Sequence, residues 1–206
     1  MERLLKGFSV LALTFFLLHG CASTTLKTVW IDEAYQGGPL KKVFVMGVSH
    51  KPTVKRFFED EFARELKARG TDAITSYSTI PQEKMNDKDF IVSKVKELGA
   101  DAVLVTMLVD KQTMDTYYPP EVRYSGPYHR GGWYGNYSRG YSYYATPGYV
   151  VREQVVVLET NVYDLNTEKP IFSALSETYL EDSPDALIRS FVQLMIKELG
   201  QKHLIK

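Results

Sequence analysis

The stretch AVLVTMLV, residues 102–109, is apolar throughout except for Thr106, and it decides the fold class. A continuous apolar run of this length is typical of a strand that is buried on both faces of a sheet. Two shorter β-rich runs precede it, at residues 42–48 (KVFVMGV) and 73–77 (AITSY). Helical segments separate the three runs, so residues 42–109 predict the order β-α-β-α-β with right-handed crossovers.

The first predicted helix covers residues 53–69, between Pro52 and Gly70, which punctuate its two ends. Its apolar side chains recur every four residues: Val54, Phe58, Phe62 and Leu66. The second covers residues 87–98 and ends before Gly99. Its inward positions are Ile91, Val95 and Leu98.

The carboxyl-terminal part predicts an antiparallel hairpin followed by a last helix. Residues 150–163 and 171–180 are strand-like, and the turn-rich segment DLNTEKP, residues 164–170, separates them. Ser183 and Pro184 are a helix cap and a first helical residue, and Gly200 is expected to end that helix. The predicted fold is therefore α/β with α+β character: one mixed sheet, helices packed on it, and a long Tyr/Gly-rich insertion.

The amino terminus predicts export. Residues 7–18 are apolar behind Arg3 and Lys6, and they would span only about 18 Å as a helix, too short for a bilayer core of about 30 Å. A short apolar run behind a positive start is typical of a secretory signal, here residues 1–20. The sequence Leu18-His19-Gly20-Cys21 resembles the lipobox of bacterial lipoproteins.

The lipobox resemblance implies cleavage between Gly20 and Cys21 and lipidation of Cys21. Acyl chains on Cys21 would anchor the protein firmly. Ala22 implies the periplasmic face of the outer membrane. An ordinary signal peptide with an incidental cysteine is the alternative. Residues 21–40 are then a lipidated tether, in which 28–35 is a short strand or a docking segment, and residues 41–206 form one domain.

The hairpin carries a second resemblance. Its turn, Val162-Tyr163-Asp164-Leu165-Asn166-Thr167, and the strand after Pro170 lead into the last amphipathic helix. This arrangement is similar to the amino-terminal domain of the Tol translocation protein and to lipoproteins that activate penicillin-binding proteins. The resemblance implies an adaptor or assembly role in the cell envelope and no chemistry.

Residues suited to catalysis are scattered. His50, in a loop after a strand, and Asp110, at a strand end, are the best single candidates, but neither has a second ligand or base at a useful spacing. Glu59, Asp60 and Glu61 point about 100° apart on a helix, which predicts a solvated face with pairs such as Asp60–Arg64. We therefore expect a non-catalytic protein without metal or cofactor. A periplasmic hydrolase using His50 or Asp110 is the alternative.

Charge and cysteine content further narrow the functional classes to which the protein can belong. The chain has 25 basic and 25 acidic residues, so its net charge gives no indication that it binds nucleic acid. Cys21 is the only cysteine, so neither a disulfide within the chain nor a thiolate metal cluster can form. His203, close to the end of the chain, is expected to be exposed.

Residues 117–149 differ in composition from the rest of the chain, because they hold ten of its 14 tyrosines. Tyrosine offers a large flat face and one hydroxyl for contacts, and the glycines let the backbone adapt. Four hypotheses stay open for this insertion: an excursion without a partner, a surface for an envelope protein or glycan, a membrane-surface segment, and self-association. The candidate binding residues are Tyr128, Arg130, Trp133, Tyr134, Tyr137 and Tyr141.

Overall fold

A computed structural model of the chain describes residues 24–119, 148–180 and 183–206. The strands are β1 (Thr24–Ile31), β2 (Lys42–Val48), β3 (Asp72–Thr75), β4 (Ala102–Tyr118), β5 (Tyr149–Asp164) and β6 (Pro170–Tyr179). The helices are α2 (Pro52–Ala68), α3 (Ser76–Thr79), α4 (Lys88–Glu97) and α6 (Pro184–Gln201), with a 3-10 turn η1 (Gln82–Lys84).

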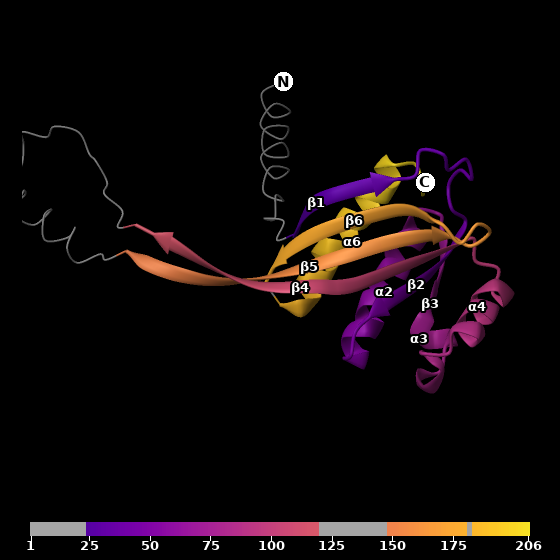
Figure 1. Cartoon of the computed structure of the whole chain (residues 1–206), viewed down its shortest axis with the longest axis horizontal. Helices are drawn as coiled ribbons and strands as arrows, with labels where there is room; N and C mark the ends of the chain where they lie inside the picture. The colour runs from indigo at the N-terminus through magenta and orange to yellow at the C-terminus, as the bar shows by residue number, and fades with distance from the viewer. Residues whose placement is uncertain (1–23, 120–147, 181–182) are drawn as a thin grey trace, which may run out of the picture.

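One six-stranded mixed sheet organises these elements, in the order β1-β6-β5-β4-β2-β3 (Figure 1). The strands β3, β2 and β4 are parallel to one another, as the β-α-β-α-β pattern predicts. The pairs β4–β5, β5–β6 and β6–β1 are antiparallel. The predicted fold class, with its single mixed sheet and its hairpin, is confirmed.

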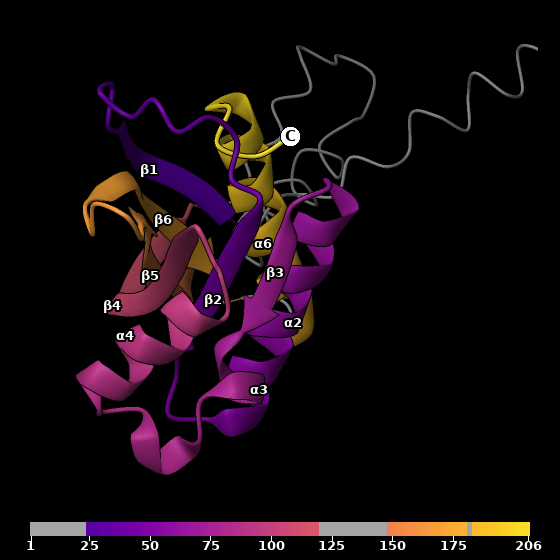
Figure 2. The ribbon, with the colours of Figure 1, turned by 90° about the vertical axis from the view of Figure 1, so that its right-hand side faces the viewer.

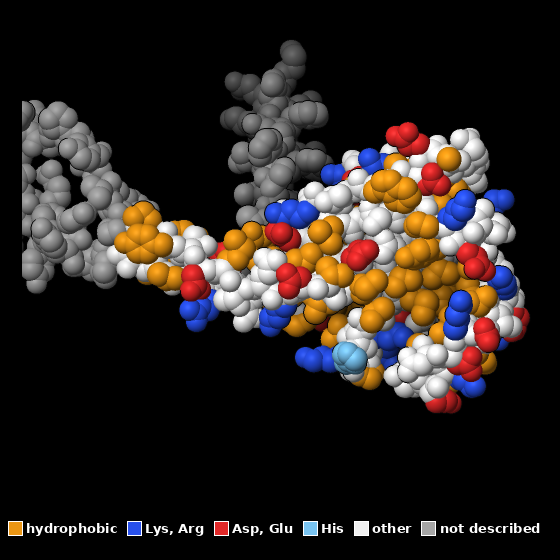
Figure 3. Space-filling model, viewed as in Figure 1, with side chains coloured by type: hydrophobic (Ala, Val, Ile, Leu, Met, Phe, Trp, Pro, Cys, Tyr) orange, Lys and Arg blue, Asp and Glu red, His pale blue; other side chains and the backbone are white. Residues whose placement is uncertain are grey.

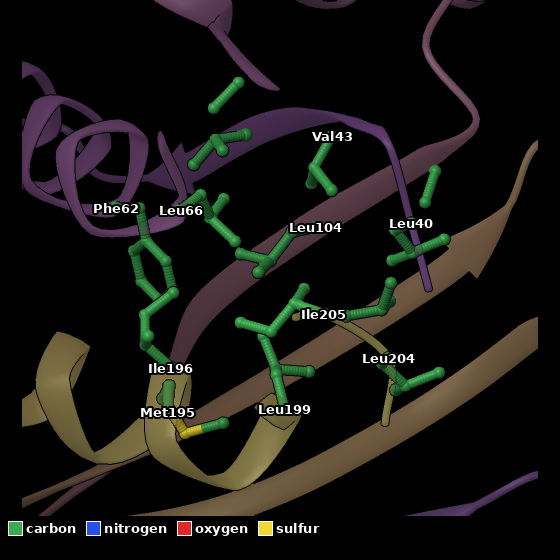
Figure 4. Close-up of a cluster of buried hydrophobic side chains, with 14 of the residues drawn as sticks. Leu40, Val43, Phe62, Leu66, Leu104, Met195, Ile196, Leu199, Leu204 and Ile205 are labelled. Atoms are coloured by element: carbon green, nitrogen blue, oxygen red, sulfur yellow. The ribbon is translucent and has the colours of Figure 1, made fainter. Parts of the chain in front are cut away.

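Helices cover the two sheet faces unequally (Figure 2). On one face α2 and α6 enclose the larger core, in which Phe62 and Leu66 of α2 meet Met195 and Leu199 of α6 over Leu104 of the sheet (Figure 4). The rings of Phe58 and Phe62 have centroids 5.0 Å apart, and Phe191 of α6 lies within 6.1 Å of both. The larger core therefore joins the sheet to its first and last long helices.

A smaller core lies on the opposite face, where α3, α4 and the chain between them cover β2 and β3. Its fully buried members are Phe44, Ile80 and Val95. Apolar side chains of α4, including Ile91 and Leu98, pack around them. This cluster explains why both faces of the amino-terminal part of β4 are covered.

The predicted start of the last helix at Ser183 is confirmed, and its predicted end at Gly200 is wrong. Asp87 accepts a hydrogen bond from the Phe90 N–H, and Ser183 accepts one from the Ala186 N–H, so both residues cap helices. Gly200, predicted to end the last helix, lies inside α6, which runs to Gln201. The left-handed residue is His203 instead (φ 58°), and it turns the chain so that Leu204 returns to the core.

The predicted tether at residues 21–40 needs correction. Residues 24–31 form β1, which pairs along β6 from Thr24 opposite Thr178 to Ile31 opposite Phe172. Leu26, Val29 and Ile31 pack against the larger core. The sequence offered only 28–35 as a short strand or docking segment, because Lys27 and Thr28 interrupt the apolar pattern and the pairing partner lies about 150 residues away in sequence.

Two predicted strand boundaries are also wrong. The second strand ends at Thr75, and residues 76–79 form the single turn α3 instead. The strand predicted at 102–109 continues to Tyr118, and its residues Leu108 and Val109 are exposed rather than buried on both faces. Polar residues dominate this extension, so the length of the apolar run underestimates the length of the strand.

No helix among the described residues is long and apolar enough to cross a membrane.

Candidate interaction arm

The paired ends of β4 and β5 extend well beyond the rest of the sheet (Figure 1). The last residue of β4 that pairs with β2 is Met107, and β5 meets the end of β6 at Val155, opposite Tyr179. Residues 108–118 of β4 and 149–154 of β5 are here called the arm. Its outer part, 113–118 paired with 149–154, is a two-stranded ribbon, whereas residues 108–112 pair with the part of β5 that β6 also pairs. Within the described chain no strand pairs with the outer edges of the arm, although the Leu180 N–H donates to the Gln154 carbonyl at 2.8 Å at the base of the β5 edge.

Cross-strand contacts hold the arm together. Arg152 donates from Nε to Asp115 Oδ1 at 2.8 Å and from Nη2 to Asp115 Oδ2 at 3.0 Å. This two-bond contact lowers the pKa of the Asp115 carboxyl below its ordinary value. At the end of the arm the rings of Tyr118 and Tyr149 stack with centroids 5.3 Å apart. Paired aromatic and oppositely charged residues of this kind stabilise antiparallel strands.

A register shift marks the base of the arm. Leu108 lies opposite Leu158, but Asp110 lies opposite Val157, so Val109 is an extra residue in β4. A bulge of this kind bends its strand and increases the local twist. It lies just beyond the last contact of β4 with β2, where β5 still pairs with β6.

The arm exposes large apolar and aromatic side chains. Tyr117 is 62% exposed, Tyr149 59% and Val150 58%. Figure 3 shows apolar side chains gathered at the end of the arm, away from the cores. A group of exposed apolar residues on a projecting element is typical of an interaction site.

The body continues this surface on the sheet face opposite α6. No described helix lies in front of β5 and β6 in this view, and apolar side chains spread over the face (Figures 1 and 3). Trp30 of β1 is 46% exposed. Polar contacts at this face include a hydrogen bond from Asn161 Nδ2 to Glu159 Oε1 and an ion pair between Lys27 and Glu177 at 2.7 Å.

The structure revises the predicted Tyr/Gly-rich loop. Tyr117, Tyr118 and Tyr149, assigned to a loop at 117–149, belong to strands β4 and β5. The six candidate binding residues lie outside the described residues: Tyr128, Arg130, Trp133, Tyr134, Tyr137 and Tyr141. The insertion therefore begins and ends at the tip of the arm rather than at the body. Signal residue Gly20 and lipidation residue Cys21 also lie outside the described part.

His50 and Asp110 are both exposed, as is His203. Asp110 accepts hydrogen bonds only from near neighbours among the described residues, the Lys111 N–H at 2.8 Å and Gln112 Nε2 at 2.7 Å. A shallow hollow beside α4 is lined by residues 85–92 and includes neither candidate. Across the described ranges, three or more His, Cys, Asp or Glu residues never gather with metal-binding geometry.

Glu59 is the polar residue that sequence reasoning misplaced. It is fully buried, not part of a solvated face. Its Oε1 accepts the Gly47 N–H at 2.9 Å and the Ser76 hydroxyl at 2.7 Å, and its Oε2 accepts the Tyr77 N–H at 3.0 Å. Glu59 therefore joins the end of β2 to the first turn of α3. A weak signal existed, since Glu59 lies seven residues before the buried Leu66 on the same helix face.

The neighbouring acidic residues also differ from prediction. Glu61 is buried and pairs with Arg64, which also contacts Glu65. Asp60 accepts a hydrogen bond from the Tyr77 hydroxyl, so the expected pair with Arg64 is replaced. All three carboxylates of residues 59–61 thus have defined structural partners.

No family model matches the chain, and no curated protein matches it. Solved structures with a similar chain trace include the PelC dodecamer from Paraburkholderia phytofirmans, at 14% identity and a TM-score of 0.46, covering 87% of this chain and 97% of that one. Lipoprotein GNA1162 from Neisseria meningitidis has 12% identity and a TM-score of 0.41, with coverage of 78% and 99%.

A third similar structure is a neuraminyllactose-binding hemagglutinin homolog from Helicobacter pylori, at 14% identity and a TM-score of 0.35. It covers 82% of this chain and 89% of that one. The neighbours thus include a bacterial lipoprotein. Likeness at these values gives no function to this chain.

Proposed function

We propose that this protein is a non-catalytic, lipid-anchored envelope protein that binds a partner protein through its arm. The observation that carries the proposal is the arm itself. It holds exposed Tyr117, Tyr149 and Val150 beyond the sheet and begins and ends the aromatic insertion. The arm contributes no side chain to either core, so a contact role explains its presence.

The unpaired edges of the arm favour a protein over a glycan. Each edge presents backbone N–H and C=O groups at the spacing that an added β-strand requires. Exposed tyrosines next to such an edge add side-chain contact area at low entropic cost. The neutral charge balance of the chain gives no support to nucleic acid as a partner.

The anchor in this proposal rests on Leu18, Gly20 and Cys21. Lipidation of Cys21 would hold the domain at the periplasmic face of the outer membrane, as Ala22 implies. The adaptor role fits the resemblance to the Tol amino-terminal domain and to activators of penicillin-binding proteins. Because β1 begins at Thr24, only residues 22 and 23 lie between Cys21 and the sheet in the sequence.

Photo-crosslinking in cells tests the contact surface. A photoreactive phenylalanine analogue replaces Tyr117 on the arm, and the same analogue replaces exposed Glu83 on η1 as the control. We expect a protease-sensitive adduct with a distinct envelope protein from position 117 and none from position 83. Equal adducts from both positions, no adduct, or an adduct that only a muramidase digests would contradict a protein-binding arm.

Fractionation tests the anchor separately. Cys21→Ser removes the lipidated sulfur, and the variant is expected to leave the membrane fraction. Arm crosslinks and membrane retention are measured independently, so a negative result in one experiment does not decide the other. A Cys21→Ser protein that stays in the outer membrane would refute lipid anchoring.

A further inference from the structure

The two free edges of the arm differ in length. Among the residues that the structure describes, the β4 edge is unpaired over 108–118, because its last contact with β2 is at Met107. The β5 edge is unpaired within the described chain only over residues 149–153, because the Leu180 N–H donates to the Gln154 carbonyl. The β4 edge therefore offers the longer run of free backbone donors and acceptors.

A two-stranded ribbon is marginally stable in water, and three or more strands with an apolar face are needed for independent stability. The arm exposes Val109, Met114 and Tyr117 along β4 and Val150 of β5, which lies opposite Tyr117. Adding strands to the β4 edge would satisfy its backbone groups and cover part of this surface.

The sequence of the β4 edge is complementary to itself in one register. Thr113 is the middle residue of 108–118, so antiparallel pairing about Thr113 uses the whole free edge of each strand. In that register Lys111 of one copy lies opposite Asp115 of the other, on both sides of a Thr113–Thr113 pair. Opposite charges and paired threonines both stabilise directly opposed positions.

The charges extend into a network. Asp115 already pairs with Arg152 of its own chain, so Lys111 of the second copy would complete an Arg–Asp–Lys row on one face. The β5 edge has no equivalent register. Pairing centred on Arg152 or on Glu153 sets like charges opposite each other, and pairing centred on Val151 sets Arg152 opposite Val150.

We infer that the β4 edge of the arm pairs antiparallel with the same edge of a second copy of this chain. The product is a four-stranded sheet with strand order β5-β4-β4-β5, centred on the two Thr113 residues. In this arrangement the two bodies lie at opposite ends of the shared sheet, because β2 adjoins β4 only up to Met107. The inference goes beyond the proposed function and needs neither the lipid anchor nor a partner.

Site-directed disulfide formation tests the register in the purified full chain. Directly opposed residues have Cα atoms about 4.5–5.5 Å apart, within the range that a disulfide spans. Thr113→Cys is therefore expected to give a covalent dimer on mild oxidation. Glu153→Cys on the β5 edge and Glu83→Cys on the body are the matched controls, and the parent chain with Cys21 gives the baseline.

Charge reversal tests whether Lys111 of one copy pairs with Asp115 of the other. In the Thr113→Cys background, Lys111→Glu sets a carboxylate opposite Asp115, and we expect roughly a tenfold lower dimer yield at limiting concentration. Adding Asp115→Lys together with Arg152→Glu restores opposite charges across and within the chains, so the dimer yield should recover. Circular dichroism verifies that each variant keeps the fold.

The possible results decide the inference either way. A dimer from position 113 that is lost and recovered with the charges supports it. No dimer at position 113 beyond the parent baseline, equal dimers at 113, 153 and 83, a dimer at 153 only, or a yield that ignores the charges would overturn it. Because no other protein is present, these results are independent of the photo-crosslinking test.

Discussion

The carboxylate of Glu59 lies in the protein interior, 2.7 Å from the Ser76 hydroxyl, which donates a hydrogen bond to it. Two backbone N–H groups, from Gly47 and Tyr77, donate to the same carboxylate. Lys55 Nζ is 3.8 Å away and supplies the nearest positive charge. One side chain of α2 thus satisfies donors from β2 and α3, two elements that pack around it.

Glu59→Ala should destabilise the protein by about 2–4 kcal/mol, because it leaves three donors without their buried acceptor. Glu97→Ala, on the exposed surface of α4, is the matched control and should change stability by less than about 0.5 kcal/mol. Urea denaturation followed by circular dichroism measures both. Equal midpoints for the two variants would show that the Glu59 hydrogen bonds contribute nothing net.

Two glycines at helix ends should respond to alanine with opposite signs. Gly70 has a φ of 79°, which a side chain disfavours, so Gly70→Ala should cost about 1–2 kcal/mol. Gly200 lies within α6, where alanine gains up to about 1 kcal/mol in helix propensity.

The added methyl at Gly200 would meet Arg69 Nη1 at 3.1 Å, and this exposed guanidinium can move aside. Thermal unfolding should therefore show a lower Tm for Gly70→Ala and an equal or higher Tm for Gly200→Ala. A lower Tm for both would mean that the Arg69 side chain is held in place.

The strand β1 should contribute to stability, which a tether would not. Val29→Ala removes apolar contact with the larger core and should cost about 1 kcal/mol. Thr28→Ala, its exposed neighbour on the opposite face, should change stability by less than about 0.5 kcal/mol. The difference between their denaturation midpoints measures the pairing of β1 with β6, and identical midpoints would argue against it.

The ion pair in the arm should be visible by titration. The hydrogen bonds and charge of Arg152 lower the pKa of Asp115, so the stabilisation from this pair is present above the ordinary aspartate pKa of 3.8. It is lost as the pH falls through the lowered pKa of the folded state. Arg152→Gln should raise the pKa of Asp115 toward 3.8, measured by carboxyl NMR.

Asp87 serves as the internal control of that titration. Its pKa is lowered by Lys84 and by the Phe90 N–H, far from the arm in sequence, and should not respond to Arg152→Gln. If Asp115 keeps its lowered pKa in the variant, the two-bond contact does not persist in solution.

Much of the fold could be predicted from local patterns. The four-residue spacing of Phe58, Phe62 and Leu66 predicted α2 correctly, and Ser183 with Pro184 predicted the start of α6. The apolar run at 102–109 predicted the central position of β4 in the sheet but not the length of the strand. The outer half of β4 pairs with β5 but is exposed, so it carries no apolar run. Apolar patterns in a sequence indicate which residues are buried, so they do not predict the exposed residues of the arm.

The candidate site was predictable only in part. The tyrosine-rich composition drew attention to residues 117–149, but it did not predict that Tyr117, Tyr118 and Tyr149 lie in strands. Glu59 was misassigned because charged residues on helices are usually solvated. Its partners Gly47 and Tyr77 are 12 and 18 residues away in sequence, so no local pattern reports them.

The sequence by itself determined the α/β order and the start of α6 after the Ser183 cap, because each depends on neighbouring residues. It also predicts the export signal at residues 1–20 from a local pattern. The tertiary structure alone decided that residues 24–31 join the sheet, that Glu59 is buried, and that β4 and β5 project as an arm. These three features depend on pairing and packing between segments far apart in the chain, whose free energy is set only when the sheet is assembled.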